Sequence, residues 1–208
     1  MKVVILAGGL GTRLSEYTHT IPKPMIKIKG KPLIYHIMKR YSKFGFKEFY
    51  IALGYKGYVI KNYFKKNKFG WNINLINTGR NTMTGGRIKR LQKYLNDESF
   101  MLTYGDGVSN VDLNKLLNFH KKNKKLITVT AVRPPARFGH LKIKNNVVNY
   151  FKEKAHTDEG WINGGFFVVN SKFFELIKND STILEKEPLE IACKRRKMTA
   201  FKHHGFWQ

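Results

Sequence analysis

The sequence predicts an α/β fold, in which a mainly parallel sheet carries helices on both faces. Short apolar runs alternate with amphipathic stretches along most of the 208 residues. The apolar runs have the length of buried strands, and the amphipathic stretches place apolar residues at helical spacing. Parallel strands need crossover connections, and helices between them supply these.

Strands and helices can be placed from this alternation. Buried strands are expected at residues 3–7, 49–53, 73–76, 100–104 and 127–132. Helices are expected at residues 32–43, 58–64 and 87–95. A further helix should begin after Asp112, because Asp is favoured at helix N-caps. Together these segments give the βαβ rhythm of a parallel sheet.

Beyond Arg133 the pattern changes. The runs 141–143 and 147–151 flank Asn145-Asn146, which is typical of a hairpin, and a strand follows at 166–169. Helices are expected at 172–177 and 183–194. The second is preceded by Thr182 with Glu185 three residues later, the pattern of a capping box. We see no linker or internal repeat, and expect one domain over residues 1–208.

The charge of the chain is strongly positive. Its 39 Lys and Arg residues against 14 Asp and Glu residues give a net charge of +25, which attracts polyanions. However, the lysines are spread over the whole length instead of forming one tail or one helix face. An RNA-binding protein would explain this charge but not the motifs described below, so we do not expect nucleic acid to be the partner.

Cysteine usage and the N-terminus point to the cytoplasm. A single cysteine, Cys193, excludes an internal disulfide and offers no paired metal ligand. The apolar run before Gly8 is too short for a signal peptide or a membrane span. We therefore expect a cytoplasmic location and no association with membranes.

The glycine-rich stretch after the first strand indicates an anion-binding loop. Gly8, Gly9 and Gly11 have neither the spacing of the dinucleotide fingerprint nor that of the Walker loop. Glycines nevertheless let backbone amides turn towards an anion, as they do in both motifs. A tight turn between strand and helix is the alternative interpretation.

Two basic residues near this loop favour a triphosphate as the anion. Arg13 can bind phosphate oxygens through its rigid fork. Lys23 lies between Pro22 and Pro24, whose rings restrict the backbone and so direct the ammonium group. Solvated surface charges remain the alternative for both.

At this point the sequence resembles the sugar-phosphate nucleotidylyltransferases, and among them the cytidylyl-transferring branch. The resemblance covers essentially the whole chain. The segments that carry it, in chain order, are LAGGLGTRL, IPKPM, HIMKRYSKFG, GYKGYVIKNYF, NTMTGGRIKR, TYGDGV, RPPARFG, WINGGFFVV and KHHGFWQ.

This resemblance implies both a fold and a reaction. The fold would be a Rossmann-like three-layer sandwich with a mainly parallel mixed sheet. The reaction would transfer a cytidylyl group from CTP to glucose 1-phosphate, giving CDP-glucose and pyrophosphate, with Mg²⁺ as cofactor and possible homo-oligomers. A thymidylyl- or uridylyl-transferring relative and a non-catalytic nucleotide or sugar-phosphate binding protein remain alternatives.

The resemblance also implies roles for individual residues. The catalytic residues would be Arg13 and Lys23, and the metal ligand would be Asp106. The nucleotide-binding residues would be Gly8, Gly9, Gly11, Thr12 and Arg87. The sugar-phosphate-binding residues would be Lys154, Asn163 and Gly164. On local sequence alone, Asp106 and Asn163 could be turn residues, and Arg87 could be an exposed residue at a helix start.

The chain departs from the family pattern in three places. Lys154 is followed by Ala155 where the family has proline, and the segment between Phe64 and Thr78 is shorter than usual. The family continues beyond Gln208 with a second metal-binding aspartate, so we expect this domain to be incomplete at its C-terminus relative to the family. His203 and His204 are not expected to bind a metal jointly, since neighbours on a strand face opposite ways.

Overall fold

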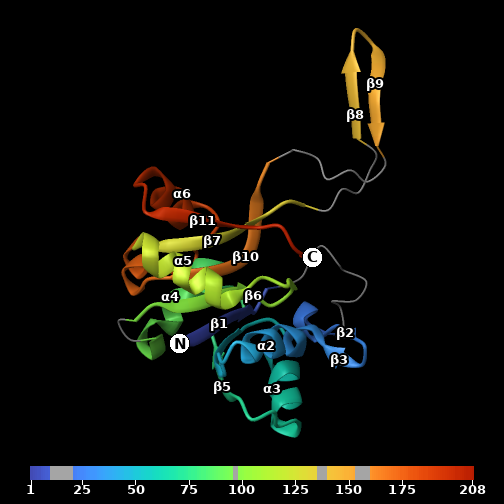
Figure 1. The fold of residues 1–208 in the computed structure, drawn as a ribbon. Coiled ribbons are helices and arrows are strands. Elements are labelled where there is room, and N and C mark those ends of the chain that lie inside the picture. The colour runs from blue at the N-terminus through green and yellow to red at the C-terminus, as the bar shows by residue number, and fades with distance from the viewer. Residues whose placement is uncertain (10–20, 96–97, 135–139, 153–159) are drawn as a thin grey trace.

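The computed structural model describes residues 1–9, 21–95, 98–134, 140–152 and 160–208. Its centre is a seven-stranded sheet with the strand order β11-β7-β10-β6-β1-β4-β5 (Figure 1). Only β10 runs antiparallel to its neighbours, β6 and β7, while the other neighbouring pairs are parallel. The expectation of a mainly parallel mixed sheet is confirmed.

Strands of this sheet are, in chain order, β1 (Lys2–Ala7), β4 (Glu48–Leu53), β5 (Asn72–Asn77), β6 (Phe100–Tyr104), β7 (Ile127–Val132), β10 (Ile162–Val169) and β11 (Met198–His203). Two small sheets pair β2 (Lys27–Ile28) with β3 (Lys31–Pro32) and β8 (His140–Lys144) with β9 (Val147–Lys152).

The helices are α2 (Leu33–Lys43), α3 (Gly57–Lys66), α4 (Thr84–Leu95), α5 (Leu113–Asn123) and α6 (Glu187–Lys194). Two short 3₁₀ helices are η2 (Lys23–Met25) and η3 (Ser171–Leu176). In the part of the chain that the structure describes, no helix is long and apolar enough to cross a membrane.

Helices cover both faces of the sheet, which gives three layers. Along β1, Val3 and Ile5 face one apolar cluster, and Val4 and Leu6 face the other. The first cluster is completed by α2, α3 and α5, and the second by α4, η3 and α6. This alternation is the period-2 pattern of a strand buried on both sides.

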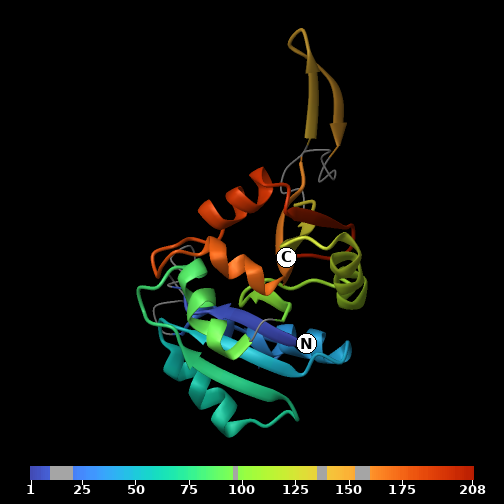
Figure 2. The same ribbon diagram turned by 90° about the vertical axis from the view of Figure 1, so that its left-hand side faces the viewer.

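Most of the predicted elements are confirmed within a few residues. The Asp112 carboxylate accepts a hydrogen bond from the Lys115 amide at 2.9 Å, so it caps α5 as expected. Asn145 and Asn146 have φ values of 48° and 66°, as a tight hairpin turn requires. The hairpin of β8 and β9 extends away from the main sheet in both views (Figure 2).

The predictions after residue 170 differ from the structure in four respects. The helix expected at 172–177 is the 3₁₀ helix η3 over Ser171–Leu176, and α6 begins at Glu187 instead of Ile183. The capping box is absent because the Glu185 carboxylate is bonded to Thr84 and Tyr104. The edge strand β11 was not predicted, because its half-exposed residues carry no clear apolar run.

Candidate active site

The central parallel strands end beside two of the predicted site residues, Gly8 and Asp106. Gly8 follows β1, Gly54 follows β4, Thr78 follows β5, and Asp106 lies two residues after β6. Because these strands are neighbours and parallel, their carboxyl ends share one edge of the sheet. Ligands of open α/β sheets bind at this edge.

Lys23 and Asp106 form an ion pair at this edge. The Lys23 Nζ atom donates to Asp106 Oδ2 at 2.5 Å. Both side chains are partly accessible, with 31% and 39% of their surfaces exposed. The pair therefore presents a cation and a carboxylate to any ligand that binds there.

Gly105 explains how Lys23 comes so close to Asp106. The turn η2 packs on Gly105, where an added Cβ atom would lie 3.0 Å from Pro24 Cγ and 2.9 Å from the Leu6 carbonyl. The Gly105 amide donates to the same Leu6 carbonyl at 2.9 Å. A side chain at position 105 would crowd Pro24 and the Leu6 carbonyl, so glycine lets the Pro-Lys-Pro turn pack closely against the end of β6.

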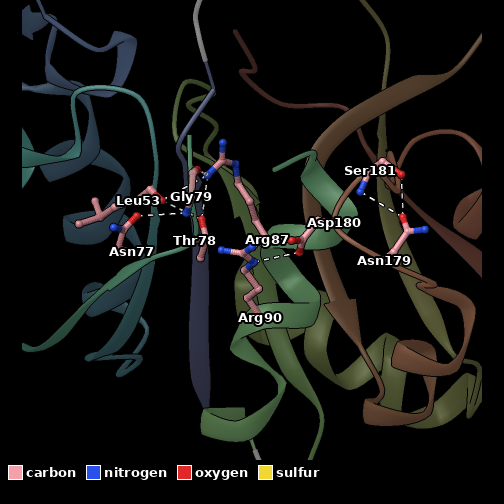
Figure 3. Close-up of polar contacts among 9 residues, drawn as sticks. All are labelled: Leu53, Asn77, Thr78, Gly79, Arg87, Arg90, Asn179, Asp180 and Ser181. Carbon is pink, nitrogen blue, oxygen red and sulfur yellow. Dashed lines mark hydrogen bonds and ion pairs between the residues drawn. The ribbon is translucent and has the colours of Figure 1, made fainter. Parts of the chain in front are cut away.

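Arg87 lies in the interior and connects the ends of three strands. Its guanidinium donates to the carbonyls of Leu53 and Gly79 and to the Thr78 hydroxyl, at 2.7–3.2 Å (Figure 3). It also donates to the carbonyls of Gly8 and Arg80, at 2.9 and 3.2 Å. Only 3% of the residue is exposed, so the alternative of an exposed residue at a helix start is wrong. Burial, and to a lesser degree Arg90, lowers the pKa of Arg87.

The guanidinium of Arg87 requires glycine on either side. An added Cβ atom at Gly8 would lie 2.3 Å from Arg87 Nη1, and one at Gly54 would lie 2.4 Å from the same atom. The Gly8 carbonyl also accepts from the Tyr55 amide at 3.1 Å. The start of the glycine loop is thus fixed by two donors from elsewhere in the chain.

Asn163 lies at an irregularity of β10 near Tyr104. Its side-chain oxygen accepts from the Gly165 amide at 2.8 Å, and its side-chain nitrogen donates to the Tyr104 hydroxyl at 3.4 Å. Gly165 has a φ of 76°, and an added Cβ there would lie 2.5 Å from Tyr104 Cδ2. The neighbouring Gly164 carbonyl accepts from the Trp207 indole at 2.7 Å. These contacts fix an exposed amide beside the site.

Tyr104 and Glu185 belong to the site but were missed by the sequence reasoning. The Tyr104 hydroxyl donates to one Glu185 oxygen at 2.6 Å, and the Thr84 hydroxyl donates to the other at 2.7 Å. Burial, followed by the Glu185 charge, raises the pKa of Tyr104 and keeps its hydroxyl protonated. The only sequence signal was an acidic residue, which we interpreted as a helix cap.

An open cavity of about 400 Å³ lies at the carboxyl ends of β4 and β5 and is lined in part by Leu53 and Gly54. Tyr55 and Arg80 line it, and the Arg80 guanidinium lies 5.7 Å from the centre of the Tyr55 ring. The Tyr55 amide also donates to the Gly8 carbonyl. Tyr55 therefore connects the wall of the cavity to the start of the glycine loop.

Four predicted site residues, Gly11, Thr12, Arg13 and Lys154, lie outside the described residues. Of those described, Gly8, Lys23, Arg87 and Asp106 belong to the same sheet edge. Gly9 is exposed, with open space where a side chain would project.

Asp106 suits a magnesium ion that a phosphate ligand would share. Magnesium prefers oxygen ligands and commonly uses one or two carboxylates together with phosphates and waters. The described residues contain no group of three His, Cys, Asp or Glu side chains able to hold a metal by themselves. The His203 ring lies 3.3 Å from the Phe206 carbonyl, whereas the His204 ring packs against Trp161. The two histidines therefore point to different partners, as expected.

The nucleotidyl transferase family model matches residues 2–207, so the chain belongs to the nucleotidyl transferase family. It is 48% identical to glucose-1-phosphate cytidylyltransferase of Salmonella typhimurium, covering 100% of this chain and 90% of the relative. It is 41% identical to a probable glucose-1-phosphate cytidylyltransferase of Bacillus subtilis, with the same two coverages.

Solved structures of related proteins share this fold. HddC from Yersinia pseudotuberculosis, in its complex with GMP-PN, superposes with a TM-score of 0.76 at 30% identity. The superposition covers 100% of this chain and 92% of that protein. The Rossmann-like three-layer architecture implied by the resemblance is thereby confirmed.

Proposed function

We propose that this protein transfers a cytidylyl group from CTP to glucose 1-phosphate, with CDP-glucose and pyrophosphate as products. The observation that carries the proposal is the ion pair of Lys23 and Asp106 at the same sheet edge as Gly8. The choice of cytidine and glucose is supported by two relatives of that name that match the whole chain.

In the proposed reaction, a phosphate oxygen of glucose 1-phosphate attacks the α-phosphorus of CTP in line. The bond between this phosphorus and the oxygen bridging to the β-phosphate breaks, and its electron pair leaves with pyrophosphate. Such a reaction depends mainly on positioning and on stabilising charge. Lys23 would neutralise negative charge at the α-phosphate, and Arg13 would hold the leaving phosphates.

The nucleotide would bind along the glycine loop. Amides of Gly8, Gly9, Gly11 and Thr12 would surround the phosphates. Arg87 would act by holding the Gly8 carbonyl, since its guanidinium faces five oxygens of the protein. Magnesium, when bound by Asp106 and the phosphates, would add positive charge at the triphosphate.

The sugar phosphate would bind on the side of β10. Asn163 would contact the hexose through its exposed amide, Gly164 would do so through its backbone, and Lys154 would bind the phosphate. Tyr104 and Glu185 would be positioning residues. The Tyr104 hydroxyl accepts a hydrogen bond from the Asn163 side chain and donates one to Glu185, so the pair would keep the Asn163 amide in place.

Pyrophosphate release by the 208-residue chain tests this proposal. Glucose 1-phosphate and magnesium are supplied with each of CTP, UTP, dTTP, GTP and ATP in turn, and products are separated by chromatography. Release with CTP alone, together with CDP-glucose, is the expected result. Release with another nucleotide in place of CTP would show that the protein transfers that nucleotidyl group and not cytidylyl. Binding of CTP without any release would favour a non-catalytic binding protein.

A further inference from the structure

The outer edge of β5 lacks the usual protection of a sheet edge. β5 is the last strand of the sheet, and no other strand among the described residues pairs with its outer side (Figure 1). Its sequence NINLIN contains no charged residue and no proline, although the chain holds 39 Lys and Arg residues. Natural proteins commonly place charges or proline on such edges to prevent pairing with other chains.

An open groove of about 450 Å³ runs beside this edge, between α3 and β5. Its apolar lining is formed by Phe64, Phe69, Trp71, Ile73 and Leu75. The cations around it are Lys61, Lys65 and Lys68, all exposed, and no acidic residue lines it. The groove therefore combines an apolar floor with a positively charged rim.

The aromatic floor is already packed in place. The rings of Phe69 and Trp71 stack with their centres 5.0 Å apart, and Tyr35 lies 5.0 Å from Phe69 and 5.7 Å from Trp71. Rings held by one another lose little freedom when a ligand binds. Phe69 and Trp71 nevertheless remain partly exposed, so they can contact a partner.

We propose that the β5 edge and this groove bind an extended acidic segment of another protein. The segment would pair with β5 through backbone hydrogen bonds and place alternate apolar side chains in the groove. Its Asp or Glu residues would lie against Lys65 and Lys68. This assignment does not depend on the proposed enzymatic activity.

Charge favours an acidic partner over a second copy of the chain. Two copies paired edge to edge through β5 would bring the lysines of both grooves together, and each copy carries a net charge of +25. Like charges facing one another across an interface are unfavourable. An acidic segment removes this repulsion and would also be attracted over a distance.

Fluorescence anisotropy with the full chain tests the proposal. The probe is a labelled peptide of about eight residues that alternates glutamate with valine and isoleucine, a pattern suited to strand addition. The variant Lys65→Glu/Lys68→Glu should weaken its binding by about tenfold or more. The control Lys121→Glu/Lys122→Glu changes the net charge equally, in the last turn of α5, and should weaken binding far less.

Two further measurements separate the alternatives. Two N-methylated forms of the same peptide, one for each set of alternate residues, keep its charge, and the form whose methyl groups face β5 cannot pair with it and should bind about tenfold more weakly or worse. Equal weakening by both double variants would overturn the proposal, because only the overall charge would then matter. Absence of binding up to about 1 mM peptide would also overturn it. The proposal would also be overturned if the chain alone sedimented as a dimer and the variant Leu75→Glu sedimented as a monomer.

Discussion

Lys23 and Asp106 are joined by an ion pair of 2.5 Å although they are 83 positions apart in the chain. Pro22 and Pro24 restrict the backbone around the lysine, and the aspartate lies two residues after the end of β6. The pair connects the two predicted roles, charge neutralisation and metal binding, at one point of the site.

Loss of Lys23 should remove turnover without unfolding the protein. Lys23→Ala deletes the ammonium group that would stabilise charge at the α-phosphate, and we expect pyrophosphate release to fall by about 10²–10³-fold. The matched control is Lys27→Ala, an exposed lysine four residues away, which should keep the parent rate. Equal rates for Lys23→Ala and the parent would remove Lys23 from the mechanism.

Loss of the Asp106 charge should change the dependence on magnesium. Asp106→Asn keeps the size of the side chain but weakens a hard-cation ligand, so half-maximal rate should require about tenfold more magnesium. Glu98→Gln removes an exposed carboxylate elsewhere and serves as control. An unchanged magnesium titration in Asp106→Asn would show that this carboxylate does not bind the metal.

Arg87 should contribute strongly to stability. Arg87→Met removes one donor from each of four buried or partly buried carbonyls, of which those of Gly8 and Leu53 keep donors from Tyr55 and Thr78. We expect the free energy of unfolding to fall by about 3 kcal/mol in urea titrations. The control Arg90→Gln breaks an exposed ion pair with Asp180 and should lower the free energy of unfolding far less. Similar losses for both variants would contradict the role of Arg87 as a connector of strand ends.

Asn163 should matter for the sugar phosphate and not for the nucleotide. Asn163→Ala should raise KM for glucose 1-phosphate about tenfold, the value of roughly one hydrogen bond to a charged or polar ligand, with little change in KM for CTP. Glu185→Gln should act in the same direction through Tyr104, but more weakly. If both variants raised KM for CTP instead, Asn163 would have to be assigned to the nucleotide side.

Stability should fall below neutral pH partly through His120. Burial lowers the pKa of this histidine, whose ring lies 2.9 Å from the Thr128 hydroxyl. The unfolded chain, in which the pKa is about 6.5, then binds the proton more readily, so stability rises as pH increases up to and through that value. His120→Asn should show a smaller change in unfolding free energy between pH 5 and pH 7.5 in urea titrations. If the parent and His120→Asn showed the same change in unfolding free energy between these pH values, His120 would not contribute to the pH dependence of stability.

The sequence was sufficient to predict the bounds of strands that are buried on both faces, and the start of a helix whose capping residue lies next to it in the chain. β6 and β7 begin and end where the apolar runs 100–104 and 127–132 do, because both faces of these strands are buried. The start of α5 was predictable because Asp112 caps it locally. Edge strand β11 was not, since one exposed side removes the apolar run on which the prediction depends.

The sequence by itself determined that a glycine-rich stretch follows the first strand, that a lysine lies between two prolines and that an aspartate follows a later strand, and from this pattern we predicted phosphate chemistry. Only the tertiary structure decided that Lys23 meets Asp106, that Arg87 is enclosed by Gly8 and Gly54, and that Glu185 supports Tyr104. These contacts join residues far apart in the chain. They depend on which strands become neighbours in the sheet, and local patterns of apolar and polar residues do not specify that order.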